Sequence, residues 1–138
     1  MQTGGSSAPL NLNAHKSDCS TFTYAVTVAG VSELVLIGIH TDPDSVVEEM
    51  EALVDVHAAV ERRWNTDNIL IMGDLNADCN YASGRARERL TLRTDLRFTW
   101  LIHDDVDTTT TRSHCAYDRC VSAWSKTPRI QSILAAIC

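Results

Sequence analysis

The chain has 138 residues, of which 44% are hydrophobic and 22% are charged. This balance is that of a globular protein and excludes a disordered tail, a collagen-like rod and a coiled coil, and the length predicts one domain. The net charge is −6, whereas a general nucleic-acid binder is basic, so acting on phosphates would require local basic residues or a bound metal. The longest apolar run, residues 34–39, is too short to span a membrane, and we expect no membrane partner.

The first part of the chain predicts an irregular segment followed by two strands. Residues 1–20 are rich in Gly, Ser and Asn and show no periodicity, which indicates a flexible or irregular segment. Residues 21–28 alternate as in a half-buried strand, and residues 33–40 form the continuous apolar run of a strand buried on both faces.

A long helix is expected next. Ser45 and Glu48 have the spacing of a capping box, which marks a helix start. Apolar residues and a histidine then follow at helical period: Val46, Val47, Met50, Leu53, Val54, His57, Val60 and Trp64. A short apolar run at 69–72 predicts the following strand, so this part of the chain reads as a βαβ-type unit.

Polar residues stand where these two strands end, at His40 and at Asp74, so both are expected at the same sheet edge. Asp74 and Asn76, two residues apart, can hold a metal or a phosphate oxygen, although an Asx-type turn would use the same pattern. His40 is a candidate general acid or base, with a structural histidine as the alternative.

Shorter strands are expected at 98–102 and 115–122, separated by an acidic, threonine-rich loop. Asp118 lies within the second of these apolar strands, where a charge needs compensation. Since Arg119 must point to the opposite face, we expect Asp118 to orient another group. Four residues alternate along the loop and could bind calcium, or belong to a solvated loop: Asp107, Thr109, Thr111 and Ser113.

The five cysteines, at positions 19, 79, 115, 120 and 138, match no zinc-binding pattern. Their odd number indicates one or two disulfides and a remaining thiol.

Four motifs in order resemble the deoxyribonuclease I family over Leu34–Val121. They are Ile-Gly-Ile-His-Thr-Asp-Pro, Met-Gly-Asp-Leu-Asn-Ala-Asp-Cys-Asn-Tyr from Met72, the segment Arg93–Ile102, and the run from Asp107 through Cys-Ala-Tyr-Asp-Arg. The resemblance implies the α/β endonuclease/exonuclease/phosphatase fold, a two-layer β-sandwich with flanking helices, here incomplete. It also implies hydrolysis of phosphodiester bonds in double-stranded DNA by a secreted endonuclease, with Mg²⁺ and Ca²⁺ as cofactors.

The resemblance also implies a role for individual residues. His40 would protonate the leaving oxygen, Asp118 would orient a second histidine that activates water, and Asp74 and Asn76 would bind metal or phosphate. The other matches are two DNA-contacting tyrosines, a disulfide and a structural calcium site: Tyr81 and Tyr117; Cys79 with Cys115; and Asp107, Thr109, Thr111 and Ser113. Cys120 replaces an aliphatic residue and is expected to be a buried thiol.

The sequence also departs from the family pattern. It lacks the early strands with their glutamates and the late segment with the second histidine, and residues 125–138 have no counterpart. We therefore expect a partial family domain at 21–124, inactive by itself and monomeric, from a secreted parent whose signal peptide is not in this sequence; the nucleus is the alternative compartment. Two further hypotheses remain: a catalytically dead DNA- or protein-binding remnant, or another phosphodiesterase of the same fold.

Overall fold

The computed structural model describes residues 22–28, 31–123, 132, 136 and 138. The predicted strand–helix–strand unit is confirmed: β2 (Val31–His40) and β3 (Ile69–Asp74) are parallel neighbours, and α1 (Val46–Trp64) connects them. Their register runs from the pair Val35 and Ile69 to the pair His40 and Asp74. Both strands therefore end at the same edge of the sheet, as the sequence predicted.

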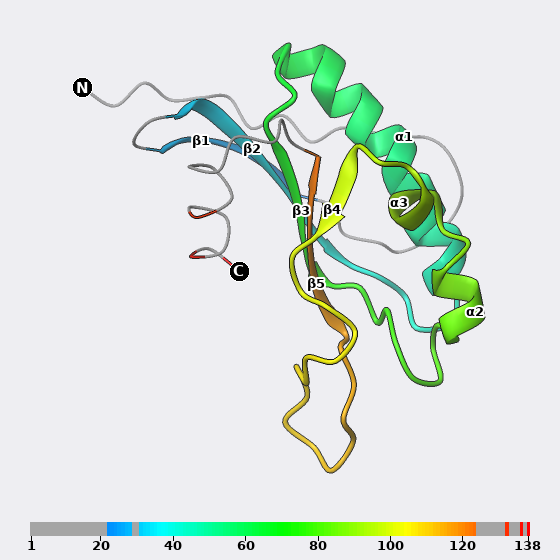
Figure 1. The fold of residues 1–138 in the computed structure, drawn as a ribbon. Helices are drawn as coiled ribbons and strands as arrows, with labels where there is room; N and C mark the ends of the chain where they lie inside the picture. Colours follow the sequence, from blue (N-terminus) through cyan, green and yellow to red (C-terminus); the bar gives the residue numbers. More distant parts are fainter. Residues whose placement is uncertain (1–21, 29–30, 124–131, 133–135, 137) are drawn as a thin grey trace.

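Three more strands complete a five-stranded sheet of order β1-β2-β3-β5-β4 (Figure 1). The strands β1 (Phe22–Val28), β4 (Phe98–Trp100) and β5 (Asp118–Ala123) pair antiparallel to their neighbours. Two four-residue helices, α2 (Gly84–Arg87) and α3 (Thr91–Thr94), lie between β3 and β4. The sequence did not predict them, because a single helical turn is too short to show periodicity.

The last two strands are shorter than predicted. The chain leaves the sheet after Trp100, and β5 begins only at Asp118. The backbone before Asp118 is held by side chains and by the backbone N–H groups of Leu75 and Thr108, instead of by strand pairing. Asp78 Oδ2 accepts the N–H of Ala116 at 2.9 Å, and Thr108 Oγ1 accepts the N–H of Tyr117 at 3.0 Å.

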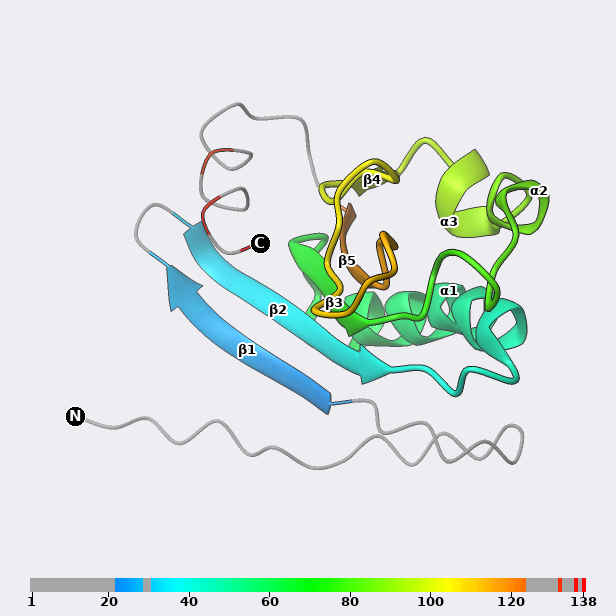
Figure 2. The same cartoon turned by 90° about the horizontal axis from the view of Figure 1, so that it is seen from below.

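The helix α1 covers one face of the sheet with the apolar residues that the sequence placed on one stripe. Met50, Leu53 and Val60 are buried in a cluster with Ile37 and Ile71 from β2 and β3. In both views α1, α2 and α3 lie on the same side of β3 and β5 (Figures 1 and 2). The odd-numbered residues of these strands therefore form the helix-covered face.

The start of α1 differs from the predicted capping box. Ser45 precedes the helix but makes no side-chain bond to a backbone N–H, and Glu48 is not its partner. The Ser45 hydroxyl instead meets Glu49 Oε1 at 3.5 Å, and Glu49 Oε2 accepts the N–H of Asp42 at 3.1 Å. Because Glu49 is buried against the turn that enters the helix, its carboxylate takes the role that the spacing assigned to Glu48.

The even-numbered residues form the opposite face of the sheet, which we call the open face: Leu34, Leu36, Leu70, Met72 and Cys120, with Leu101 and Ile102 packed beside them. Cys120 is buried, as expected, but it is not a thiol: it forms a disulfide with Cys138. The prediction of a free thiol at Cys120 was wrong because Cys138, the last residue of the sequence, reaches the open face on which Cys120 lies.

The expected irregular segment 1–20, including Cys19, and most of the divergent segment 125–138 lie outside the described residues. The division of the chain into residues 1–20, 21–124 and 125–138 therefore stays a prediction. Among the described helices, none combines the length and apolar character required to cross a bilayer.

Candidate functional site

Three polar side chains stand in register where three neighbouring strands meet the same sheet edge. His40 ends β2, Asp74 ends β3 and Asp118 begins β5, and the register pairs His40 with Asp74 and Asp74 with Asp118. Neighbouring strands lie about 5 Å apart, so these side chains are adjacent on one face. His40 Nε2 lies 3.6 Å from Asp74 Oδ2. An imidazole and two carboxylates thus share a solvent-accessible edge.

Asp118 lies at the start of its strand and is exposed, so the prediction that it sits inside an apolar strand is wrong. Partial desolvation at the strand end and the adjacent Asp74 carboxylate raise the pKa of Asp118, and His40 opposes the rise. Two carboxylates this close repel one another, and a cation placed between them would relieve that repulsion.

Asn76 ties together the loops that follow β2 and β3. Its side chain is buried, and Nδ2 donates to the carbonyl oxygen of Thr41 at 3.0 Å. Its own N–H donates to Asp74 Oδ1 at 3.0 Å, which is an Asx-type turn. The turn offered as an alternative explanation of the motif is therefore present, and it also fixes the Asp74 carboxylate at the sheet edge.

Gly73 allows β3 to approach β2 closely beside this turn. Its φ is +141°, and a Cβ at this position would lie 2.0 Å from the carbonyl oxygen of Ile39. Any side chain here would push apart the two strand ends that carry His40 and Asp74.

The two tyrosines implied by the resemblance lie against each other beside this edge. The rings of Tyr81 and Tyr117 are 5.4 Å apart at 49°, and Tyr81 is exposed. The carbonyl oxygen of Tyr117 accepts the N–H of Leu75, which places the pair next to the Asp74 turn. Desolvation, followed by the neighbouring Tyr81, raises the pKa of the Tyr117 hydroxyl, so it remains a hydrogen-bond donor at neutral pH.

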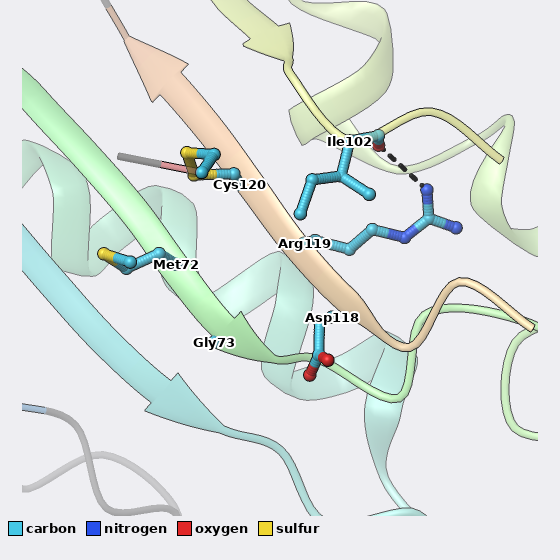
Figure 3. A pocket seen from close by; sticks show the side chains of 7 residues that line it. Met72, Gly73, Ile102, Asp118, Arg119 and Cys120 are labelled. Atoms are coloured by element: carbon cyan, nitrogen blue, oxygen red, sulfur yellow. Dashed lines mark hydrogen bonds between the residues drawn. A yellow bond between two sulfur atoms is a disulfide. The ribbon is translucent and has the colours of Figure 1, made fainter. Parts of the chain in front are cut away.

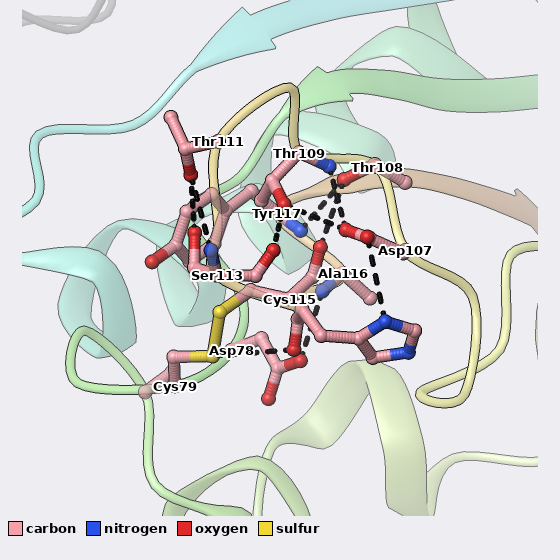
Figure 4. Close-up of a disulfide and its surroundings, with 12 residues drawn as sticks. Asp78, Cys79, Asp107, Thr108, Thr109, Thr111, Ser113, Cys115, Ala116 and Tyr117 are labelled. Carbon is pink, nitrogen blue, oxygen red and sulfur yellow. Dashed lines mark hydrogen bonds and ion pairs between the residues drawn. A yellow bond between two sulfur atoms is a disulfide. The ribbon is translucent and has the colours of Figure 1, made fainter.

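The expected disulfide between Cys79 and Cys115 is confirmed (Figure 4). It joins the loop after β3 to the segment before β5, so it links the loops carrying Tyr81 and Tyr117. Asp78 reinforces this link. Burial alone would raise the pKa of Asp78, but the N–H donors of Ala116 and Cys79 and the nearby guanidinium of Arg87 hold it below its usual value.

The threonine-rich loop gathers oxygen atoms, but as a turn instead of the predicted extended ladder (Figure 4). Asp107 Oδ1 accepts the N–H of Thr109 at 2.9 Å, and the Thr109 hydroxyl lies 2.6 Å from both that oxygen and the carbonyl oxygen of Ser113. The hydroxyls of Thr111 and Ser113 bond to one another. The Thr109 hydroxyl and N–H lower the pKa of Asp107.

Sequence reasoning missed a buried ion-pair network behind the site. The Arg119 side chain has 0% exposure and pairs with Asp104 Oδ1 at 2.8 Å. It also donates to the carbonyl oxygens of Ala77 and Ile102, at 2.9 and 3.1 Å. Arg119 thereby holds the loops after β3 and β4 together. The available signal was its position next to Asp118, which turns it toward the helix-covered face, where it needs a partner.

Within the described ranges, no group of three or more His, Cys, Asp or Glu side chains is arranged to hold a metal ion. Any cation at Asp74 and Asp118 would therefore complete its coordination with amide oxygens, water or substrate.

Comparison with known proteins supports the sequence motifs. Residues 2–127 match the Endonuclease/Exonuclease/phosphatase family. The chain is 47% identical to deoxyribonuclease gamma of Homo sapiens over 92 residues, covering 66% of this chain and 30% of that protein. It is 41% identical to deoxyribonuclease-1 of Bos taurus over 95 residues, covering 69% and 34%.

The chain spans about a third of the length of these relatives. The matches confirm the predicted resemblance and fold class. The described residues form a mixed sheet with flanking helices, which agrees with that class. On this match the chain belongs to the endonuclease/exonuclease/phosphatase family.

Proposed function

We propose that His40, Asp74, Asn76 and Asp118 belong to an active site that hydrolyses phosphodiester bonds of double-stranded DNA. The observation that carries the proposal is the register of His40, Asp74 and Asp118 at one accessible sheet edge. The names of the deoxyribonuclease relatives support DNA as the substrate.

His40 acts as the general acid in this proposal. Its side chain is 69% exposed, so a phosphodiester can reach it, and histidine exchanges protons near neutral pH. Asp74 Oδ2, 3.6 Å from Nε2, faces the imidazole that must donate a proton to the leaving oxygen. Asp118 is the positioning group for the second histidine of the family pattern, which would be the base that activates water.

Asp74 and Asn76 fit a magnesium ion. A carboxylate and an amide oxygen are hard ligands, and Mg²⁺ is commonly held by one or two carboxylates together with water and substrate phosphate. Desolvation and the nearby Asp74 carboxylate raise the pKa of Asp118, and the repulsion between the two carboxylates also favours a cation at this edge. When bound, the ion would neutralise charge on the phosphate.

The tyrosine pair, of which Tyr81 is exposed, and the threonine-rich loop complete the proposed surface. Tyr81 and Tyr117 present aromatic and hydroxyl groups to DNA. Because these groups are uncharged, they can contact DNA although the chain is acidic overall. Asp107, Thr109, Thr111 and Ser113 form the structural calcium site, because their oxygens already gather in one turn.

The described site favours binding over hydrolysis for this chain by itself. His40 acts on both carboxylates of the edge, since it lies near Asp74 and lowers the pKa of Asp118. As a single side chain, His40 can act either as the general acid or as the general base, whereas hydrolysis requires an acid and a base at the same time. When catalytic residues act as a unit, the lack of one costs nearly as much activity as the lack of all. We therefore expect this chain alone to bind DNA and to cleave it negligibly.

A binding assay and a cleavage assay on the 138-residue chain test these two statements separately. A fluorescent phosphorothioate duplex should bind more tightly when Mg²⁺ is present, and Asp74→Asn should remove most of that increment. Asp55→Asn on the exposed side of α1 makes the same charge change and should not. DNA binding that does not respond to Mg²⁺ or to Asp74→Asn would contradict the site. Plasmid nicking that disappears in His40→Ala would show that the chain alone is active.

We further propose that the protein is monomeric and secreted. Its two disulfides support secretion, because such bonds persist in oxidising compartments.

A further inference from the structure

The arginine next to Asp118 does not supply positive charge to a bound phosphate. A chain with a net charge of −6 needs positive side chains near the site if it is to hold a DNA backbone. The side chain of Arg119 extends toward Ile102 and donates to its carbonyl oxygen at 3.1 Å (Figure 3). It is also paired with Asp104 and has 0% exposure. Positive charge for a phosphate must therefore come from another segment.

Residues 83–93 carry charge of the opposite sign to the chain as a whole. They include four arginines and one acidic residue, Glu88. Two of these arginines have carboxylate partners: Arg87 and Arg93. The other two, Arg85 and Arg89, are exposed, and neither side chain forms an ion pair or a hydrogen bond within the ranges that the structure describes. We call Arg85 and Arg89 the arginine pair.

The helical geometry of α2 turns the arginine pair toward solvent. Arg87 points inward, because its side chain is 12% exposed and its Nη1 donates to the carbonyl oxygen of Ala82 at 2.6 Å. Arg85 and Arg89 lie two positions before and after Arg87, and each helical residue rotates by about 100°, so both lie on the opposite side. The N–H of Arg89 donates to the carbonyl oxygen of Ala86, which continues the helical turn beyond α2.

The arginine pair is held close to the exposed tyrosine of the proposed site. Arg87 Nη1 lies 2.7 Å from Asp78 Oδ1, and the N–H groups of Tyr81 and Ala82 donate to the carbonyl oxygen of Asp78. These bonds fix α2 to the loop that carries Tyr81. Arg85 follows Tyr81 by four residues, so their Cα atoms are at most about 14 Å apart. Phosphates of one strand are spaced by about 3.4 Å along the duplex axis, so DNA at Tyr81 also passes Arg85 within a few nucleotides.

We propose that the arginine pair binds backbone phosphates of double-stranded DNA beside the sheet edge, on the side of Tyr81. This proposal rests on the proposed function, which brings the duplex to Tyr81. A guanidinium donates two parallel N–H bonds to phosphate oxygens, and such contacts position a duplex without reading its sequence. Each phosphate contact also releases condensed counterions, so the arginine pair should contribute to the salt dependence of binding.

The salt dependence of duplex binding tests the proposal. A fluorescent phosphorothioate duplex is titrated with the 138-residue chain at NaCl concentrations from about 50 to 200 mM, without divalent cations. The logarithm of the association constant is plotted against the logarithm of the salt concentration. In the double variant Arg85→Gln/Arg89→Gln the slope should be shallower by about 1.8, because each lost phosphate contact removes about 0.9.

The matched control is Arg62→Gln/Arg63→Gln. It makes the same charge change at two exposed positions in the last turn of α1, at the end of the helix far from α2 (Figure 1). The control should keep the wild-type slope. The single variants Arg85→Gln and Arg89→Gln should each lose about half of the difference, and all variants should keep the wild-type melting temperature.

Equal slopes in the wild type and Arg85→Gln/Arg89→Gln would overturn the proposal. A decrease of the same size in the control would also overturn it, because net charge would then explain the effect. A variant that loses binding to heparin but not to the duplex would show that the arginine pair binds a polysaccharide instead.

The response to Mg²⁺ separates this proposal from the proposed function. The increment in duplex binding that Mg²⁺ gives and that Asp74→Asn removes should be equal in the wild type and in Arg85→Gln/Arg89→Gln. An intact increment with unchanged slopes would overturn the role of the arginine pair alone. The expected change in slope without any Mg²⁺ increment would contradict the site at Asp74 alone.

Discussion

The two faces of the sheet differ in what their residues do, although they belong to the same strands. The helix-covered face carries Ile37, Ile71 and Val121, which have 0% exposure and pack with α1. The open face begins with apolar residues and ends in His40, Asp74 and Asp118. Along β3, for example, Leu70, Met72 and Asp74 follow one another on that face.

This difference shows that stability and chemistry are separated by the alternation of strand residues. A shift of one residue in register would turn His40 and Asp74 toward the helix-covered face and would turn Ile37 and Ile71 toward the open face. The packing of α1 therefore enforces the register that brings the polar side chains together. Substitutions on the helix-covered face should change stability, whereas substitutions at the edge should change ligand binding.

The largest effect is expected from the Cys79–Cys115 disulfide. It lies beside the edge that carries His40 and Asp74 but should change stability, so stability and chemistry are not strictly separated there. Replacing both Cys79 and Cys115 by Ala opens a loop with a sequence separation of 36. Loss of this constraint on the unfolded chain should reduce the free energy of unfolding by roughly 3–4 kcal/mol. Urea unfolding measures the difference, with Cys19→Ala as the control. An unchanged urea midpoint in the double variant would contradict the prediction.

The helix-covered face gives the next largest effect. Leu53→Ala removes a side chain with 1% exposure from the cluster between α1 and the sheet. Lost burial and the remaining cavity should reduce the free energy of unfolding by about 3 kcal/mol. Leu96→Ala, at a position with 92% exposure, should change it by less than about 0.5 kcal/mol. Similar losses in the two variants would show that α1 does not form the core.

Much of this architecture could be predicted from periodicity. The apolar run before His40, the stripe of α1 and the run before Asp74 each bury one continuous surface, so their patterns are unambiguous. The motif resemblance added the pairing of Cys79 with Cys115, which the count of cysteines alone left open. These features depend on local spacing, which a sequence displays directly.

The features that the sequence did not predict depend on contacts between distant segments. Glu49, not Glu48, holds the helix entry because it is the carboxylate that faces Asp42. Arg119 finds Asp104 across the β4–β5 connection. Cys120 bonds with Cys138 because the chain returns to its own strand. None of these partners is set by spacing along one element.

Calcium should have a smaller effect, confined to the edge loops. If the oxygens around Asp107 bind Ca²⁺ only when the loop is folded, calcium at ten times its dissociation constant should stabilise the protein by about 1.4 kcal/mol. Asp107→Ala should abolish this increment, and the hydrogen bonds it loses to Thr109 should lower the melting temperature equally with and without calcium. Thermal melts with and without calcium measure both quantities. The same increment in Asp107→Ala would exclude this loop as the site.

The smallest effect should come from His57, which is buried on the helix-covered face. His57 has 3% exposure, contacts the ring of Phe98 and leaves its Nε2 without a hydrogen-bond partner. Burial lowers the pKa of His57 and outweighs the opposing charges of Glu61 and Asp95, while Arg97 acts in the same direction as burial.

The unfolded chain therefore binds a proton more readily at this position than the folded protein does. The stability that His57 provides as a neutral side chain is present above its ordinary pKa of about 6.5 and is lost as the pH falls toward its lowered folded value. The urea midpoint should be lower at pH 5.5 than at pH 7.5 in the wild type, and His57→Leu should reduce that difference. His103→Leu, at an exposed position, should retain it. A difference of equal size in wild type and His57→Leu would show that His57 does not contribute to the pH dependence of stability.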